Sequence, residues 1–168
     1  MFLSVESELK KIVTTRAMQV LIISIISMLL AQLIKFVFYS IRYKRPCWKL
    51  LVSTGGFPSS HTSFTVALCI SLGMFQWREM QSLDWSFAVA VVFAAITIHD
   101  AYGVRFEASK HAIILNNLTE DLTSEERVEL GFGKKGKLKE MLGHKITEVL
   151  GGIVVGIAVG IAGFYICA

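Results

Sequence analysis

The sequence predicts an all-α fold, a polytopic membrane bundle of about four transmembrane helices that forms one domain over residues 1–168. Of its 168 residues, 54% are hydrophobic, which is typical of membrane proteins. The apolar stretches are mostly near the ~20 residues that a helix needs to cross a bilayer. The basic residues stand beside these stretches and are not interleaved with aromatic residues. This pattern indicates orientation in a membrane and excludes nucleic acid as a partner.

The first two predicted spans cover residues 17–41 and 62–77. The first follows basic residues, but it is too long for the apolar part of a signal peptide and lacks a small-residue cleavage pattern. It is therefore expected to be retained. The second is short and follows the sequence GGFPSS, whose glycines, proline and serines predict a turn. At membrane depth such a turn is tolerated only where protein or a water-filled cavity surrounds it.

The third and fourth spans are predicted at residues 85–104 and 146–166. A polar loop over residues 105–145 separates them and is expected to be a surface excursion, not a second domain. Its segment ASKHAIILNNL has a helical pattern, and Thr123 with Glu126 forms a candidate capping box.

The basic residues divide unevenly between the two membrane faces. Four spans place the loops at 42–60 and 105–145 on one face, with twelve of the 17 Lys and Arg residues. The opposite face has only Lys10, Lys11, Arg16 and Arg78. The positive-inside rule therefore predicts an integral membrane protein with cytoplasmic loops and with both termini on the opposite side.

Ionisable residues from all four spans are expected to meet at this cytoplasmic face. Such groups are costly in or near hydrocarbon, so their convergence predicts a functional site. They stand at the ends of the first and third spans and at the starts of the second and fourth: Lys35, Arg42, His61, Asp100, Arg105, His144 and Glu148.

The cations of the first span suit an anionic ligand. Lys35 and Arg42 are seven residues apart and therefore share a helix face. Each also has an ordinary interpretation, because Lys35 could extend toward the interface and Arg42 could anchor the span. Asp100 is expected to neutralise Arg105 or Lys35, either as a structural pair or to orient the arginine toward a substrate.

The sequence PSSHTSF predicts the capped start of a helix. The free N–H groups and the positive dipole at such a start bind phosphate readily. Gly55 and Gly56 would permit a close approach of the backbone. Ser59 and Ser60 would contact the anion, and His61 could deliver a proton. The alternative is an ordinary helix cap with an interfacial histidine.

His144 and Glu148 are four residues apart at the start of the fourth span, so they share one helix face. A carboxylate bonded to one imidazole nitrogen leaves the other free to attack or to take a proton. A zinc or manganese site is a weaker alternative because no H-E-x-x-H or cysteine signature is present, so no cofactor is expected. Its ligands would come from His99, Asp100, His111, His144 and Glu148.

Small residues repeat every four positions along the fourth span. Such a face lets helices approach closely, either within the bundle or between the copies of a homo-oligomer. The residues are Gly152, Gly156 and Gly160.

Most of the chain resembles the divergent, small-membrane-protein branch of the type 2 phosphatidic acid phosphatase and vanadium haloperoxidase superfamily. The segments that carry the resemblance are AQLIKFVFYSIR, GGFPSSHTSF, HDAYGVRFEASKHAIILN and LGHKITEVLGG. The second is similar to the superfamily's Pro-Ser-Gly-His motif, with Ser60 in place of the glycine. The stretch from Lys35 to Arg42 is similar to its first motif, with Tyr43 where a proline stands.

The third motif of the superfamily has an arginine six residues before its histidine and an acid four residues after it. His144 and Glu148 match its last part, with glutamate for aspartate, but Arg105 lies 39 residues before His144. His111 lies six residues after Arg105, yet Leu115 then stands where the acid should be. His144 is therefore preferred to His111 as the nucleophile.

The resemblance implies a membrane phosphatase that hydrolyses a phosphomonoester or diphosphate of a lipid. His144 would attack phosphorus to form a phosphohistidine, Glu148 would orient it, and His61 would protonate the leaving oxygen. Charge on the phosphoryl oxygens would be stabilised by Lys35, Arg42 and Arg105. The alternative is a non-catalytic membrane protein that binds or transports a phosphorylated lipid or another anion.

Overall fold

The computed structural model describes residues 15–48, 50, 55–132, 136–139 and 143–167. Within them the chain is helical and has no strand. The helices are α2 (Arg16–Tyr43), α3 (Ser60–Met80), α4 (Trp85–Tyr102), α5 (Val104–Leu118), α6 (Ser124–Glu129) and α7 (Ile146–Cys167). Five residues used to predict the orientation lie outside the described residues: Lys10, Lys11, Lys49, Lys134 and Lys135.

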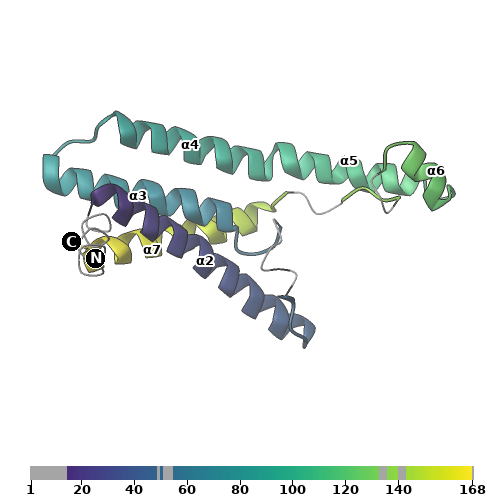
Figure 1. Ribbon diagram of the computed structural model, residues 1–168, viewed down its shortest axis with the longest axis horizontal. Helices are drawn as coiled ribbons and strands as arrows, with labels where there is room; N and C mark the ends of the chain where they lie inside the picture. The colour runs from purple at the N-terminus through teal and green to yellow at the C-terminus, as the bar shows by residue number, and fades with distance from the viewer. Residues whose placement is uncertain (1–14, 49, 51–54, 133–135, 140–142, 168) are drawn as a thin grey trace, which may run out of the picture.

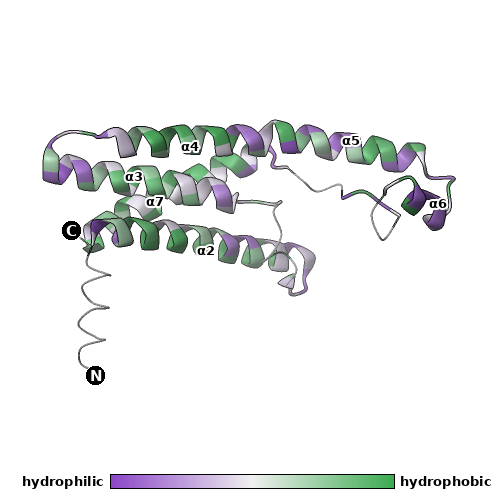
Figure 2. Ribbon diagram, turned by 45° about the horizontal axis from the view of Figure 1, so that its top comes forward, coloured by the Kyte–Doolittle hydropathy of each residue, from purple (hydrophilic) through white to green (hydrophobic). Residues whose placement is uncertain are grey.

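Three of the described helices are long and apolar enough to cross a membrane, namely α2, α7 and the 34-residue stretch Trp85–Leu118 that comprises α4 and α5. The second predicted span, which the structure extends to Ser60–Met80 as α3, is not among them. The outward faces of α2, α4 and α7 are largely hydrophobic (Figure 2). These faces are suited to contact lipid.

The low apolarity of α3 follows from its central place in the bundle. It packs against α2, α4 and α7 (Figure 1). Because neighbouring helices cover it, small hydroxyl side chains can satisfy their hydrogen bonds without meeting lipid. The Ser27 and Ser63 hydroxyls lie 2.6 Å apart between α2 and α3, and Ser71 donates to the Ala67 carbonyl at 2.7 Å. Hydropathy is high where a helix contacts lipid. Because α3 mainly contacts other helices, its hydropathy is lower.

Glycines of α7 allow its close approach to α3. A Cβ atom at Gly152 would lie 2.5 Å from the Ser59 carbonyl oxygen, and one at Gly156 would lie 2.7 Å from the Ser63 carbonyl oxygen. Gly160 meets Ile70 in the same way. All three glycines are buried. The face considered above for a homo-oligomer is therefore occupied by α3 within one chain.

A small apolar core closes the end of the bundle where α3 and α7 finish. The cluster consists of Val20, Ile23, Phe75 and Phe164. The rings of Phe75 and Phe164 meet edge to face, with centroids 5.0 Å apart.

The expected polar excursion begins as an extension of α4. After an interruption at Gly103, α5 continues beyond the bundle and carries the hydrophilic α6 at its far end (Figures 1 and 2). Thr123 and Glu126 form the predicted capping box of α6. The Asn116 side chain donates to the Leu138 carbonyl at 3.0 Å and accepts from the Leu138 N–H at 2.9 Å. These two bonds attach the chain that returns toward α7 to α5.

Candidate active site

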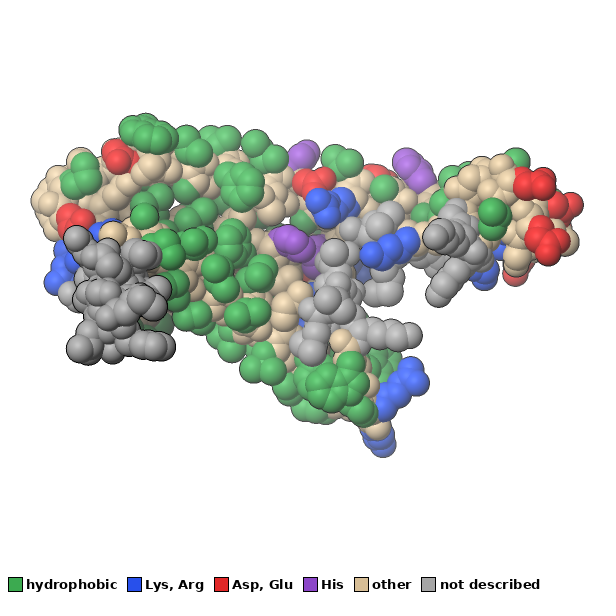
Figure 3. Space-filling view, in the orientation of Figure 1, with side chains coloured by type: hydrophobic (Ala, Val, Ile, Leu, Met, Phe, Trp, Pro, Cys, Tyr) green, Lys and Arg blue, Asp and Glu red, His purple; other side chains and the backbone are tan. Residues whose placement is uncertain are grey.

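The starts of α3 and α7 meet at the end of the bundle from which α5 extends. The Ser59 N–H donates to the Glu148 carbonyl at 2.9 Å, which joins the two helix starts directly. His61 and His144, one from each helix, therefore lie at the same end of the bundle. On the visible face, histidine, acidic and basic side chains gather where the bundle meets α5 (Figure 3).

The segment before α3 forms the predicted helix cap. Ser59 is the N-cap residue, and its hydroxyl accepts from the Thr62 N–H at 3.4 Å. Ser59 and Ser60 are both buried. The first turn of α3 is therefore fixed between α2 and α7, while His61 itself is exposed.

His144 and Glu148 form a buried pair at the start of α7. Nδ1 of His144 lies 2.9 Å from Oε2 of Glu148, and their side chains are 4% and 14% exposed. A carboxylate can only accept a hydrogen bond, so Nδ1 carries the hydrogen and Nε2 keeps a lone pair. Nε2 is buried and has no hydrogen-bond partner among the described residues. A buried polar atom without a partner is unusual and is typical of a ligand or reaction site.

Backbone N–H groups hold the Glu148 carboxylate in place. The Lys145 N–H donates to Oε2 at 3.3 Å, and the backbone of Gly56 also donates to this side chain. Glu148 therefore stays positioned beneath His144, and it accepts from two separate segments of the chain.

A third segment positions the backbone of His144. Its N–H donates to the Ala101 carbonyl at 2.9 Å, near the junction of α4 and α5. The preceding residue, Gly143, lies so close to this junction that an added Cβ would be 2.4 Å from the Phe106 nitrogen. Only glycine fits there, so the chain can reach α4 just before His144. Beside His144 lies a cavity of about 260 Å³ that Tyr102 and Phe106 help to line.

Lys35 of α2 lies under the turn that precedes α3. The residue is fully buried, and its charge interacts with that of Glu148. A Cβ atom at Gly56 would be 3.5 Å from the Lys35 side chain and 3.2 Å from the ring of Tyr39. Gly56 has φ of +98°, a backbone conformation that favours glycine. Gly56 therefore has a backbone conformation that favours glycine, and it also makes the close backbone approach that the sequence predicted.

Arg105 and Asp100 form an ion pair across the junction of α4 and α5. Arg105 is thus one of the two partners predicted for Asp100. Both side chains are partly exposed, and His61 lies within range of the charges of Arg105, Lys35 and His144. The Arg105 side chain therefore faces solvent near His61, and Asp100 balances part of its charge.

Two predicted candidates lie apart from this cluster. Arg42 is exposed in the last turn of α2, and its side chain makes no hydrogen bond or ion pair within the described part of the chain. His111 is exposed on α5. Of the two histidines considered as nucleophile, only His144 has an acidic partner among the residues that the structure describes. Over the described ranges, no three His, Cys, Asp or Glu side chains gather where they could hold a metal ion.

Sequence reasoning missed Tyr39. Its hydroxyl accepts from the Phe57 N–H at 3.3 Å, so it supports the turn before α3. Tyr39 follows Lys35 by four residues and therefore shares its helix face, a signal that could have identified it. The contacts of Gly143 and Ala101 have no such signal, because they join segments that are remote in sequence.

Comparisons with known proteins agree with the resemblance found in the sequence. A protein of Bacillus subtilis (strain 168), described as uncharacterized membrane protein YuiD, is 37% identical over 144 residues, which cover 82% of this chain and 88% of the relative. No solved structure matches the chain. The model of the family described as the Divergent PAP2 family matches residues 16–159. The chain therefore belongs to the Divergent PAP2 family and is a membrane protein.

Proposed function

We propose that this protein is a membrane phosphatase that hydrolyses a phosphomonoester or diphosphate of a lipid through a phosphohistidine intermediate. The observation that carries the proposal is the state of His144. Its Nδ1 is bonded to Glu148, whereas its Nε2 is buried without a partner among the described residues. That arrangement leaves one nitrogen with a lone pair and fixes its direction.

In the first step, the Nε2 lone pair attacks phosphorus as the bond to the leaving oxygen breaks. His61, as the imidazolium, donates a proton to that oxygen. The positive charge that develops on His144 is stabilised by the Glu148 carboxylate. Lys35 and Arg105 offset the negative charge of the phosphoryl oxygens, together with free N–H groups at the start of α3.

In the second step, water attacks phosphorus and the P–N bond breaks. His61, now neutral, takes the proton from the water, and inorganic phosphate leaves. The electron pair of the P–N bond returns to Nε2, so both histidines regain their starting states. Each step uses groups of the protein and water.

A lipid substrate follows from the place of the site. The cluster lies at one end of a bundle whose outer helices are apolar enough to cross a membrane. A headgroup would reach such a site by lateral diffusion in the bilayer. We propose that this face is cytoplasmic and that both termini lie opposite, because basic residues are concentrated in the loops at 42–60 and 105–145.

The test is phosphate release by the purified protein from phosphatidic acid, phosphatidylglycerol phosphate and a polyprenyl diphosphate, with and without vanadate. The His144→Ala variant should lose about a thousandfold or more in turnover, because the attacking atom is gone. His111→Ala is the matched control and should keep its activity, since His111 is exposed on α5.

Two results would overturn the proposal. One is an intact protein that releases no phosphate from these substrates and is not trapped by vanadate. The other is a His144→Ala variant that turns over as well as the parent. Binding of a phosphorylated lipid without turnover, unchanged in His144→Ala, would instead support the non-catalytic alternative.

A further inference from the structure

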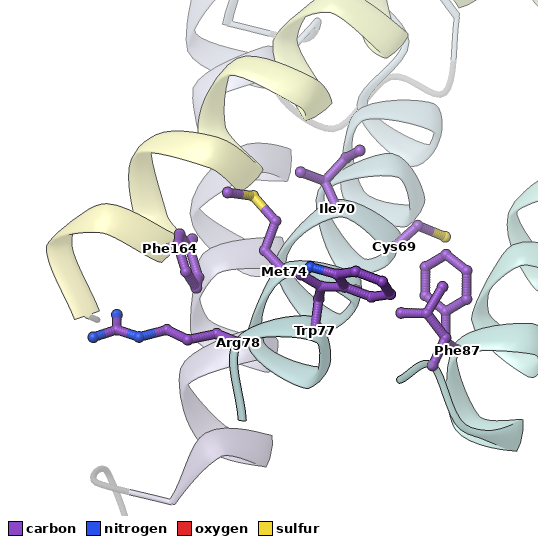
Figure 4. Close-up of a pocket in the computed structure, with 9 residues that line it drawn as sticks. Cys69, Ile70, Met74, Trp77, Arg78, Phe87 and Phe164 are labelled. Atoms are coloured by element: carbon purple, nitrogen blue, oxygen red, sulfur yellow. The ribbon is translucent and has the colours of Figure 1, made fainter. Parts of the chain in front are cut away.

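An apolar cavity lies at the end of the bundle opposite the candidate active site. Its volume is about 450 Å³, within the range of sites that bind small molecules. Residues of α3 line it between Phe87 of α4 and Phe164 of α7 (Figure 4). Met74 and Trp77 of α3 contribute large apolar side chains. The lining offers almost no polar atoms to orient a polar ligand.

Arg78 is the charged residue of this lining, and it is exposed. Figure 4 shows its side chain extending toward Phe164, with the guanidinium carbon 5.8 Å from the ring centroid. It makes no ion pair within the part of the chain that the structure describes. The nearby Arg16 differs, because it is paired with Glu79 and donates to the Cys167 carbonyl at 3.2 Å. A cation at the rim of an apolar cavity is complementary to an anionic amphiphile.

The surroundings indicate that the amphiphile is a lipid. Trp77 and Trp85 are exposed at this end, as is common where a helix meets the membrane interface. Two acidic residues described at this end already have partners: Glu79 pairs with Arg16, and Asp84 accepts hydrogen bonds from Gln76 and Ser86. They therefore compete little for Arg78.

We propose that this cavity binds an acyl chain of an anionic phospholipid whose phosphate pairs with Arg78. The occupant belongs to the leaflet opposite the candidate active site, so it is distinct from the proposed substrate. The apolar lining takes the chain, and the guanidinium supplies selectivity for the headgroup charge. The proposal does not depend on the proposed phosphatase activity.

The test uses Trp77 as a reporter within the cavity. In the full chain carrying Trp48→Phe and Trp85→Phe, Trp77 fluorescence is measured in phosphatidylcholine nanodiscs with increasing brominated phosphatidylglycerol or brominated phosphatidylcholine. The anionic lipid should quench at about a fivefold lower mole fraction, the preference expected from one basic residue near the surface. Arg78→Gln should remove this preference, whereas Arg78→Lys should keep most of it.

The matched control keeps Trp85 as the single tryptophan, with Trp48→Phe and Trp77→Phe. Trp85 is 77% exposed and does not line the cavity, so both brominated lipids should quench it equally.

A second variant, Cys69→Phe, fills the cavity and should weaken the preference at Trp77 with Arg78 intact. Equal quenching of Trp77 by the two lipids, or an unchanged preference in both Arg78→Gln and Cys69→Phe, would overturn the proposal. His144→Ala should bind the lipid normally, which separates this result from any failure of the phosphatase assay.

Discussion

The two ends of α3 lie in opposite environments. At its start, buried hydroxyl groups, Lys35 and the pair of His144 and Glu148 pack together under a short turn. At its end, Phe75 joins an apolar core, and Met74 with Trp77 lines an apolar cavity. One helix thus connects a polar cluster enclosed by protein to an apolar surface that faces lipid.

The difference shows where this bundle tolerates polar groups. At the start of α3, nearly every buried polar group has a partner, so Nε2 of His144, which has none among the described residues, stands out. Buried polar groups are retained where they are satisfied or where they serve a reaction. The other end has a smaller polar network, in which the buried Gln76 bonds to Asp84 and Ser86, and its core and cavity are lined by apolar side chains. Variants at the two ends should therefore fail in different ways.

Of the three variants that compare the two ends, Glu148→Gln at the polar end is expected to have the largest effect. The amide can present its NH₂ group to Nδ1, which would move the hydrogen to Nε2 and remove the nucleophilic lone pair. Turnover should fall about a hundredfold or more. The matched control is Glu107→Gln on α5, where the carboxylate pairs with the exposed Lys110. Full activity in Glu148→Gln would show that the carboxylate does not set the tautomer.

A smaller effect, on stability, is expected from Gly152→Ala. The added methyl group would meet the Ser59 carbonyl oxygen, which is backbone and cannot rotate away. Forced repacking of this kind costs about 1–3 kcal/mol, which lowers the thermal midpoint in detergent by several degrees. Val154→Leu on the outward face of α7 should leave the midpoint unchanged, because Val154 is largely exposed. Equal midpoints for Gly152→Ala and the parent would contradict the close packing of α7 on α3.

The smallest effect is expected at the other end of α3, from Asp84. Hydrogen bonds from Ser86, and then from Gln76, hold the pKa of this carboxyl group below its ordinary value. A lowered pKa in the folded state means that the stabilisation is complete above the unfolded pKa and is lost as the pH falls through the folded value. The thermal midpoint of Asp84→Asn should therefore lie below that of the parent above about pH 5, and the two should converge in acid. A difference that grows as the pH falls would contradict the sign.

Much of this architecture could be predicted because its signals are local. The helix cap at Ser59 and the capping box at Thr123 follow from residues three apart, and the pair of His144 and Glu148 follows from a four-residue spacing. The pairing of Arg105 with Asp100 was also among the expected arrangements. Such contacts depend on the geometry of one helix turn and not on which other helices pack nearby.

Other features depend on which helices become neighbours, and no local pattern contains that information. The mean hydropathy of α3 is too low for it to be among the candidate spans. The reason is that its polar residues face other helices. Arg42 shares a helix face with Lys35 by spacing, yet it lies about two turns farther along α2 and is exposed. The bond from His144 to Ala101 joins residues 43 apart and needs the close approach at Gly143.

That bond to Ala101 has a consequence for biogenesis. The imidazole is set by α4 through its own backbone, by α7 through its acid, and by the turn before α3, so no partial set of helices can present it correctly. Before α7 has packed against the other helices, His144 lacks both its bond to Ala101 and the acid that orients its ring. The proposed chemistry would therefore begin only when the last helix has docked.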